Sequence, residues 1–296
     1  MSDLLNGEWR LTYPGTSYSF GTPATSAWHL TTPDVGDADL RVADVDRPRQ
    51  DGRAFGVDYR GGRTISFEMG LRARSSTEAR EEAALLQQAW RADAIRSVPG
   101  AVAELRTVYD GRERLMYGRP RRLALDYGDV TVNQYVGVVA DFACSDDLFY
   151  GDVEEDVRVS LVPSLGGGLM APLAAPLSTT ASSDRSVGIN VDSEMPVWPV
   201  VRVNGPVSNA EVYVGDLFRW SLRLALDYDE YVDIDTRPWA RYALRNGSAN
   251  VTGSVRGTRL ARSSIPSGSY PVGFKGEDPT GTSSINVKWR PTFSSL

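Results

Sequence analysis

Residues 63–74 alternate between apolar and polar side chains, and this alternation constrains the fold more than any other feature of the chain. Apolar side chains would share one face of an extended segment and polar side chains the other. A period of two is the signature of a β-strand that is buried on one side only. The segment therefore predicts a half-buried strand with Ile65, Phe67, Met69, Leu71 and Ala73 inward and Thr64, Ser66, Glu68, Arg72 and Arg74 outward.

A helix is expected to follow this strand at once. Ser75-Ser-Thr-Glu78 has the spacing of a capping box, in which the serine oxygen caps the first turn and the glutamate reaches back. Small and apolar residues then recur at spacings of four, three and four, which is typical of one helical face: Ala79, Ala83, Leu86 and Trp90. The pattern predicts a helix over about 76–94, ahead of Pro99, and no second long helix.

The rest of the first half has the composition of short strands. Asp110-Gly111 separates the strand-like runs 103–109 and 112–117, and this dipeptide strongly favours a hairpin. Residues 123–127 and 130–142 continue the β pattern, whereas residues 44–62 form a turn-rich loop before the alternating strand. We expect residues 1–162 to form an antiparallel β-barrel or sandwich domain with one packed helix.

A second domain is expected after a change in composition. Gly, Pro, Ser and Ala dominate residues 163–186, which predicts a linker. Short strand-like runs separated by turn signals then return over residues 187–296, without a long helix. They predict a β-sandwich with strands near 197–203, 211–214, 219–226, 230–235, 239–244, 270–275 and 283–290. The chain is thus expected to be mainly β.

Composition excludes several classes of function. The net charge is −6 and the pI about 5.0, whereas nucleic-acid binders are usually basic, so we expect no recognition of nucleic-acid sequence. No run approaches the ~18 apolar residues of a membrane helix, so no membrane insertion is predicted. We expect no secretory signal, since the N-terminal residues have no basic and apolar regions, and the single Cys144 excludes an intramolecular disulfide. Both features favour folding in a reducing cytoplasm.

Catalysis and metal binding have little support in the sequence. His29 is the only histidine, and neither it nor Cys144 lies in a catalytic signature, so the chain is not expected to be an enzyme. One Cys and one His cannot supply a structural zinc site. Carboxylates at residues 227–235 could suggest calcium, but Val232 and Pro238 occupy the positions where an EF-hand requires Gly and Glu. We predict no catalytic residue, no cofactor and no metal.

The order of loop, alternating strand and helix over residues 44–91 resembles the N-terminal domain of siphovirus distal tail (Dit) proteins, or minor tail proteins, of long-tailed bacteriophages. The second domain resembles the galectin-like β-sandwich at the C-terminus of the same family. The segments that carry this second resemblance are Asn204-Gly205, 232–236, Asn246-Gly247, 265–268 and 278–290. Their order across two domains is more specific than any one of them.

The resemblance implies a structural virion protein at the tail tip, assembled in the host bacterial cytoplasm. Family members form a homohexameric ring through their N-terminal domains. The ring joins the tail tube protein to the tail-tip hub, or tail-associated protein, and its receptor-binding parts. Only two of the 32 cations are lysines, Lys275 and Lys288. This arginine bias favours a GC-rich genome, such as that of an actinobacterial phage.

A closed ring repeats one heterologous contact, so each subunit needs two different complementary surfaces. The loop and strand at 44–63 and the arginine-rich hairpin at 112–122 are the candidate surfaces. The arginines of the hairpin are expected either to form a solvated strand face or to lie in an interface, where arginine is enriched. The resulting subunit-interface candidates are Arg49, Asp51, Arg53, Arg63, Arg112 and Arg114.

An alternative function is a carbohydrate-binding adhesin that contacts host cell-wall glycan through the C-terminal sandwich. A sugar could stack on an exposed aromatic ring. Trp198, Trp220 and Trp289 lie in strand patterns and are expected in the core, which leaves Trp239 as the sugar-contact candidate. A third alternative, a glycoside hydrolase, needs two carboxylates at a defined separation, and nothing in the sequence selects such a pair.

Overall fold

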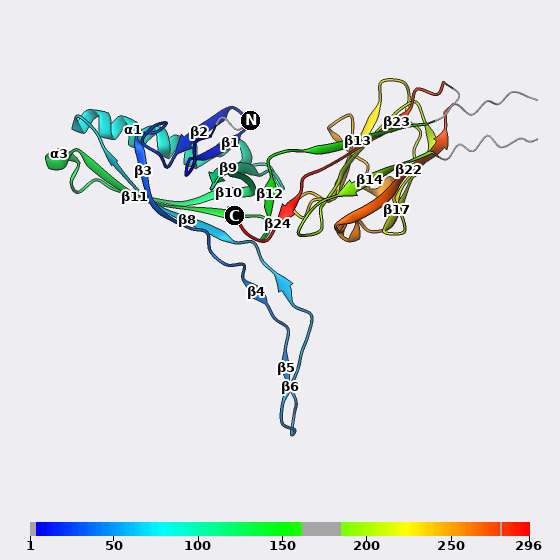
Figure 1. The fold of residues 1–296 in the computed structure, drawn as a ribbon, viewed down its shortest axis with the longest axis horizontal. Coiled ribbons are helices and arrows are strands. Elements are labelled where there is room, and N and C mark those ends of the chain that lie inside the picture. Colours follow the sequence, from blue (N-terminus) through cyan, green and yellow to red (C-terminus); the bar gives the residue numbers. More distant parts are fainter. Residues whose placement is uncertain (1–3, 162–184, 279) are drawn as a thin grey trace, which may run out of the picture. The chain divides into compact units, whose positions relative to one another are not determined.

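The computed structural model describes residues 4–161, 185–278 and 280–296. Two compact units divide the chain, Met1–Asp152 with Phe293–Leu296, and Val153–Thr292 (Figure 1). The expected domain boundary was residue 162, but strand β13 (Glu155–Ser160) pairs with β23 (Ser284–Trp289) and so belongs to the second unit. The expected linker, 163–186, lies outside the described residues except for its last two positions.

One large antiparallel sheet forms the first unit. Its main path runs β2-β1-β9-β10-β11-β8-β3, with β12 added to β10 and β24 to β12. The two ends of this path approach each other, because the backbone of Gly21 just after β2 bonds Trp28 and Leu30 on β3. The sheet is therefore nearly closed. Its strands are β1 (Trp9–Tyr13), β2 (Thr16–Phe20), β3 (Trp28–Asp34), β8 (Thr64–Arg72), β9 (Ala103–Tyr109), β10 (Arg112–Asp126), β11 (Tyr135–Cys144), β12 (Phe149–Gly151) and β24 (Thr292–Phe293).

The predicted half-buried strand is confirmed as β8, which lies between β11 and β3. Its residues alternate between buried and solvent-facing positions along their whole length. Ile65 and Phe67 are fully buried, and Met69 and Leu71 nearly so. Phe67 packs edge-on against Trp9 and Phe20, with ring centroids 4.9 and 5.1 Å away.

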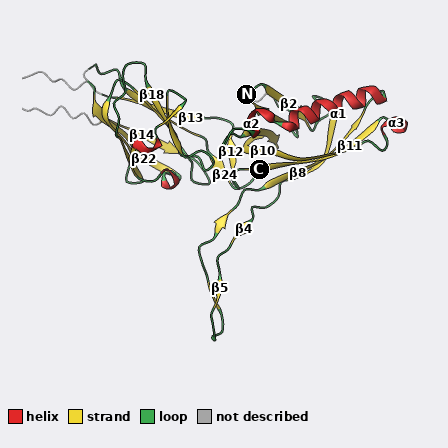
Figure 2. Cartoon of the chain, turned by 180° about the vertical axis from the view of Figure 1, so that it is seen from behind, coloured by secondary structure: helices red, strands yellow, loops and turns green. Residues whose placement is uncertain are grey.

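The predicted helix is confirmed as α1 (Ser76–Arg91). Ser75 caps it by accepting a hydrogen bond from the backbone N–H of Glu78, whose carboxylate accepts one from the N–H of Arg74. The apolar face buries Ala79, Ala83, Leu86 and Trp90 as expected. Short helices follow at α2 (Asp93–Arg96) and α3 (Val130–Asn133). Figure 2 shows α1 lying along the sheet of the first unit.

The predicted hairpin at Asp110-Gly111 is confirmed as the two-residue connection between β9 and β10, whose ends Tyr109 and Arg112 pair. Both turn residues have positive φ, 48° and 73°. This is the conformation that the right-handed twist of a two-residue hairpin requires, and Asp and Gly adopt it at low cost.

A long two-stranded arm connects β3 to β8 (Figure 1). We define the arm as residues 36–62. Two short antiparallel ladders hold it together, β4 (Leu40–Arg41) with β7 (Tyr59–Arg60) and β5 (Val45–Asp46) with β6 (Arg53–Ala54). All eight residues of these ladders are exposed. The arm therefore adds nothing to the core of its own unit.

The second unit is a sandwich of two antiparallel sheets. A six-stranded sheet has the order β13-β23-β15-β18-β19-β20, and a five-stranded sheet the order β14-β22-β16-β17-β21. An apolar cluster that includes Trp220 and Phe274 is buried within the unit. The remaining elements are β14 (Arg185–Val191), β15 (Val200–Asn204), β16 (Ser208–Val214), β17 (Phe218–Leu222), β18 (Tyr231–Asp235), β19 (Tyr242–Arg245), β20 (Ala249–Asn250), β21 (Val255–Gly257), β22 (Gly268–Glu277), η1 (Thr252–Ser254) and η2 (Leu260–Arg262).

The predicted fold class is confirmed. The described chain is mainly β, with a nearly closed sheet and one long packed helix in the first unit and a β-sandwich in the second. Each of the seven strands expected over residues 187–296 corresponds to an observed strand.

We expect Phe67→Ala to lower the free energy of unfolding by about 3–5 kcal/mol, because it removes a fully buried ring from the aromatic cluster. Urea unfolding followed by tryptophan fluorescence would measure the change. Glu68→Ala, at an exposed position on the same strand, is the matched control and should change stability by less than about 0.5 kcal/mol. Equal effects of the two substitutions would contradict this account of the core.

Candidate functional site

The arm carries a concentration of exposed apolar side chains. Phe55 is 85% exposed, and five further apolar residues of the arm are each more than half exposed: Leu40, Val42, Val45, Val57 and Tyr59. Single exposed apolar residues are ordinary on protein surfaces, whereas a contiguous group of them marks an interaction site. The arm is therefore the first candidate functional surface.

Charged residues lie at the tip of the arm, beyond the ladder of β5 and β6. Arg49 and Asp51 are exposed there, and Arg49 has a positive φ of 61°. Arg53 is held within the arm, since its guanidinium lies 3.2 Å from Asp46 and 3.6 Å from Asp44. Of the three predicted interface residues in this segment, the charged groups of Arg49 and Asp51 therefore remain accessible to a partner.

The base of the arm is fixed to the loop that follows β11. Arg60 pairs with Asp147 at 3.0 Å, and Arg63 donates to the Asp147 carbonyl at 2.5 Å and lies over the Phe149 ring. A Cβ at Gly62 would lie 2.1 Å from the Cys144 carbonyl oxygen, so only glycine permits this approach. Arg63, a predicted interface residue, thus anchors the arm within its own chain.

Arg112 and Arg114, the candidates in the hairpin, have different environments. Arg112 is exposed at the start of β10, next to the turn. Arg114 is only 8% exposed, and its guanidinium stacks 3.9 Å from the centre of the Phe293 ring. It also donates to the backbone carbonyl of Glu113. Arg112 is available to a partner, whereas Arg114 is used inside its own unit.

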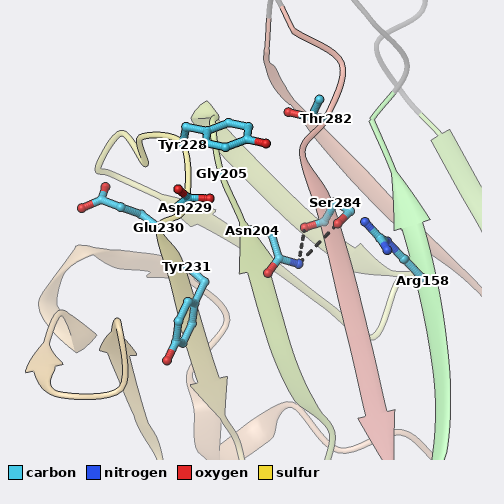
Figure 3. A pocket seen from close by; sticks show the side chains of 9 residues that line it. All are labelled: Arg158, Asn204, Gly205, Tyr228, Asp229, Glu230, Tyr231, Thr282 and Ser284. Carbon is cyan, nitrogen blue, oxygen red and sulfur yellow. Dashed lines mark hydrogen bonds between the residues drawn. The ribbon is translucent and has the colours of Figure 1, made fainter.

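The second candidate surface is the outer face of the six-stranded sheet in the second unit. Side chains alternate along β15, with Val201 and Val203 buried and Asn204, Arg202 and Val200 directed outward. A pocket of about 290 Å³ lies at the Asn204 end, and Figure 3 shows it with Tyr228 and Arg158 among the residues that line it. A second pocket of about 530 Å³ includes Arg202 and Val200 in its lining.

Trp239, the sugar-contact candidate, lies in the turn before β19 and is half-buried. The guanidinium of Arg237 lies 5.3 Å from its ring centre. Arg237 lines the larger pocket, but Trp239 does not. Trp220 and Trp289 are buried, in agreement with the expectation for them, and Trp198 is half-buried beside Arg241.

The titratable groups considered for catalysis do not come together. Burial raises the pKa of the Cys144 thiol to about 12, so it is a poor nucleophile. His29 is exposed opposite Gly70, whereas Ala143, next to Cys144, pairs with Thr64. Their partners on β8, Gly70 and Thr64, are six positions apart, or about 20 Å along the strand. Within residues 4–161, 185–278 and 280–296, no group of three or more His, Cys, Asp or Glu side chains could hold a metal ion.

In the part of the chain that the structure describes, no helix is both long and apolar enough to cross a membrane.

The fold of this chain is similar to that of solved phage tail and baseplate proteins. The structure of the Dit protein of phage SPP1, a paradigm of the hub adsorption apparatus in phages that infect Gram-positive hosts, matches with a TM-score of 0.58 and 13% identity. The match covers 96% of this chain and 99% of that one. The phage P2 baseplate in its activated conformation with Ca matches with a TM-score of 0.55 and 12% identity over 98% and 99%. The resemblance drawn from the sequence is thereby confirmed at the level of the fold.

The same baseplate with Sr gives a TM-score of 0.54 at 11% identity. No protein-family model and no curated protein matches the chain. The similarity thus lies in the fold.

Sequence reasoning missed two groups of residues. The apolar side chains of the arm recur with no regular period and lie among Gly, Asp and Arg. Their unusual presence in a turn-rich loop was the only sequence feature that could have indicated an interaction surface. The polar residues on the sheet face occupy the alternate positions of strands that the sequence did predict. Asn286 and Tyr242 could have been found by listing the outward residues of each strand.

Asp146, at the base of the arm, should make stability depend on pH. Burial raises the pKa of its carboxyl to about 6 although Tyr150 donates a hydrogen bond to it. The pKa of Asp146 is higher in the folded protein than in the unfolded chain, so its protonated form stabilises the fold. This stabilisation is fully present below about pH 4 and is lost as the pH rises through about 6. In the unchanged protein, this titration should lower the free energy of unfolding by about 3 kcal/mol between about pH 4 and pH 6. In Asp146→Asn this pH-dependent loss should be absent. Urea unfolding at several pH values would test this, and an unchanged pH profile would contradict it.

Charge reversal should separate the two hairpin arginines. We expect Arg114→Glu to lower the free energy of unfolding by about 2–4 kcal/mol, since it removes the cation–π contact and places a carboxylate in a buried position. Arg112→Glu, two residues away and exposed, should change it by less than about 0.5 kcal/mol. Hydrogen exchange of the peptides that span β9 and β10 would report the difference. Equal protection in both variants would show that the Phe293 contact contributes nothing.

Proposed function

We propose that this chain is a structural virion protein of a long-tailed phage, a distal tail component of the tail tip or baseplate. The observation that carries the proposal is the arm, an extended segment with exposed apolar side chains. The similarity of the whole fold to the SPP1 Dit protein and the P2 baseplate supports it. In this proposal the chain is not an enzyme and its role is to make contacts within an assembly.

The arm is suited to a subunit contact in a homohexameric ring. A ring needs a surface on one subunit that fits a different surface on the next, and a projecting arm is such a surface. Burial of one large apolar side chain contributes about 1.5–3 kcal/mol. Association costs about 4–15 kcal/mol in lost translational and rotational freedom, so one residue cannot stabilise the contact but the apolar set of the arm can.

The proposed ring joins the tail tube protein on one side to the tail-tip hub on the other. Its place is the virion tail tip, after assembly in the host cytoplasm. The arginine-rich, lysine-poor composition supports an actinobacterial host. Arg49, Asp51 and Arg112 are the predicted interface residues whose exposure is compatible with this arrangement.

The mass of the purified protein tests the proposal. Light scattering should give six chains of 32.3 kDa each, and negative-stain images of the same fraction should show rings with a central channel. A monomer at every concentration, with or without the neighbouring tail proteins, would overturn the proposal.

Removing the apolar character of the arm should prevent ring formation. We expect Phe55→Ser combined with Val57→Ser to lower the ring population at least tenfold, because the ring would lose the burial of two large side chains. The monomer should keep its stability, since both residues are exposed. Val132→Ser in α3, at a residue 77% exposed, is the control. Rings that persist in the double variant would show that the arm is not the contact.

A second candidate function is the carbohydrate-binding adhesin module. The two polar pockets on the outer face of the six-stranded sheet favour it over a role for Trp239, which lines neither pocket. A fragment of residues 187–296 would be a poor test, because it lacks β13, an edge strand of that sheet. The whole chain is therefore the material to use.

A further inference from the structure

The outer face of the six-stranded sheet presents an extended polar surface. Asn204, Arg202 and Val200 point outward in sequence along β15, and the two pockets lie toward opposite ends of this row. Asn204 lies four positions along the strand from Val200, or about 13 Å. The volumes, about 290 and 530 Å³, are within or close to the range for small-ligand pockets. The surface is therefore long enough for a short linear ligand.

The charges of this surface are largely paired with one another. Arg202 makes two hydrogen bonds to Asp233, at 2.6 and 2.8 Å. Lys288 pairs with Glu154 at 3.2 Å. Four cations and five carboxylates line the two pockets in all. With the charges nearly balanced and mostly paired, the surface offers little attraction to a polyanion or a polycation.

Hydrogen-bonding capacity nevertheless remains. Asn286 lies between two arginines, paired with Arg158 on β13 and Arg202 on β15. Among the described residues its half-buried amide has no hydrogen-bond partner, and neither has the hydroxyl of Tyr242 in the same pocket. An amide offers two donors and an acceptor, and a phenol offers one of each. These groups match the hydroxyls of a neutral polyol.

An aromatic ring is available beside the polar groups. Tyr228 lines the smaller pocket and is 68% exposed. Figure 3 shows it above Asn204, whose amide donates to Ser284. A tyrosine ring combines a flat apolar face with a polar edge, so it can pack against the C–H face of a pyranose while its hydroxyl remains hydrated.

We propose that the outer face of the six-stranded sheet is a binding site for a neutral oligosaccharide of more than one ring, with Asn286 and Tyr242 as hydrogen-bonding groups and Tyr228 as the stacking platform. An apolar peptide would leave these polar groups without partners, at a cost for each. This inference rests on the second candidate function proposed above, the adhesin module, and names its ligand class. It does not depend on ring formation, because every residue in it belongs to the second unit.

Ligand-observed NMR and calorimetry on the whole chain would test the site with three neutral probes, chitotriose, cellotriose and maltotriose, and one acidic probe, trigalacturonic acid. We expect at least one neutral probe to bind in the micromolar to millimolar range and to bind at least tenfold more tightly than the acidic one. No binding of any neutral probe up to 10 mM, as an order of magnitude for the weakest relevant affinity, would overturn the proposal, and so would preference for the acidic probe.

Variants locate the binding. Asn286→Ala and Tyr228→Ala should each weaken binding of the neutral probe at least tenfold, and Tyr242→Phe should weaken it while keeping the ring. Matched controls are Asn190→Ala on β14 of the other sheet and Tyr109→Ala in the first unit, both at exposed positions. Unchanged affinity in Asn286→Ala and Tyr228→Ala would overturn the site. Light scattering on the same samples reports ring formation separately, so failure of one proposal is distinguishable from failure of the other.

Discussion

The edge-on packing of Phe67 in the first unit holds together parts of the chain that lie far apart in sequence. Its ring contacts Trp9 on β1 and Phe20 on β2, and Trp90 on α1 lies 6.2 Å away between centroids. Edge-to-face aromatic pairs add about 0.5–1.5 kcal/mol each to the energy of burying the rings. The strand, the first hairpin and the helix therefore share one core, and both candidate interface segments emerge from this framework.

The arm shows how a framework of this kind separates stability from function. Strands β3 and β8 are neighbours in the sheet and pair antiparallel, so a short turn would be enough to connect them. The chain instead inserts residues 36–62, most of which are exposed and none of which belongs to the buried core cluster of the unit. Ordering such a segment costs conformational entropy, and the segment also exposes apolar groups to water. Neither effect benefits a monomer. In the proposed assembly, a partner that covers these apolar groups would supply the benefit.

Much of the fold follows from local patterns in the sequence. The alternation at 64–72, the capping box at Ser75 and the turn at Asp110-Gly111 each act over a few residues, so each is legible without tertiary information. The edge position of β13, in contrast, depends on a long-range pairing, because its partner β23 lies about 130 residues later. No local signal reveals such a pairing.

The candidate sites were less predictable for the same reason. Arg112 and Arg114 look equivalent in sequence, yet Phe293 stacks on one of them and not on the other. Likewise, the groups around Asn286 come from separate strands and meet only through the register of the sheet. Residue type predicted which side chains could take part in a site, and tertiary structure alone decides which of them remain available.

The return of residues 293–296 to the first unit has a consequence for the order of synthesis. Phe293 and Leu296 pack against the core of a unit whose other residues precede Val153. On the ribosome, domains generally fold as they emerge, but here the whole sandwich must be made before the first unit receives its final segment. Until then Arg114 lacks the ring that covers it. The unit that is synthesised first is thus completed last. Its final packing can occur only after the entire second unit has been translated.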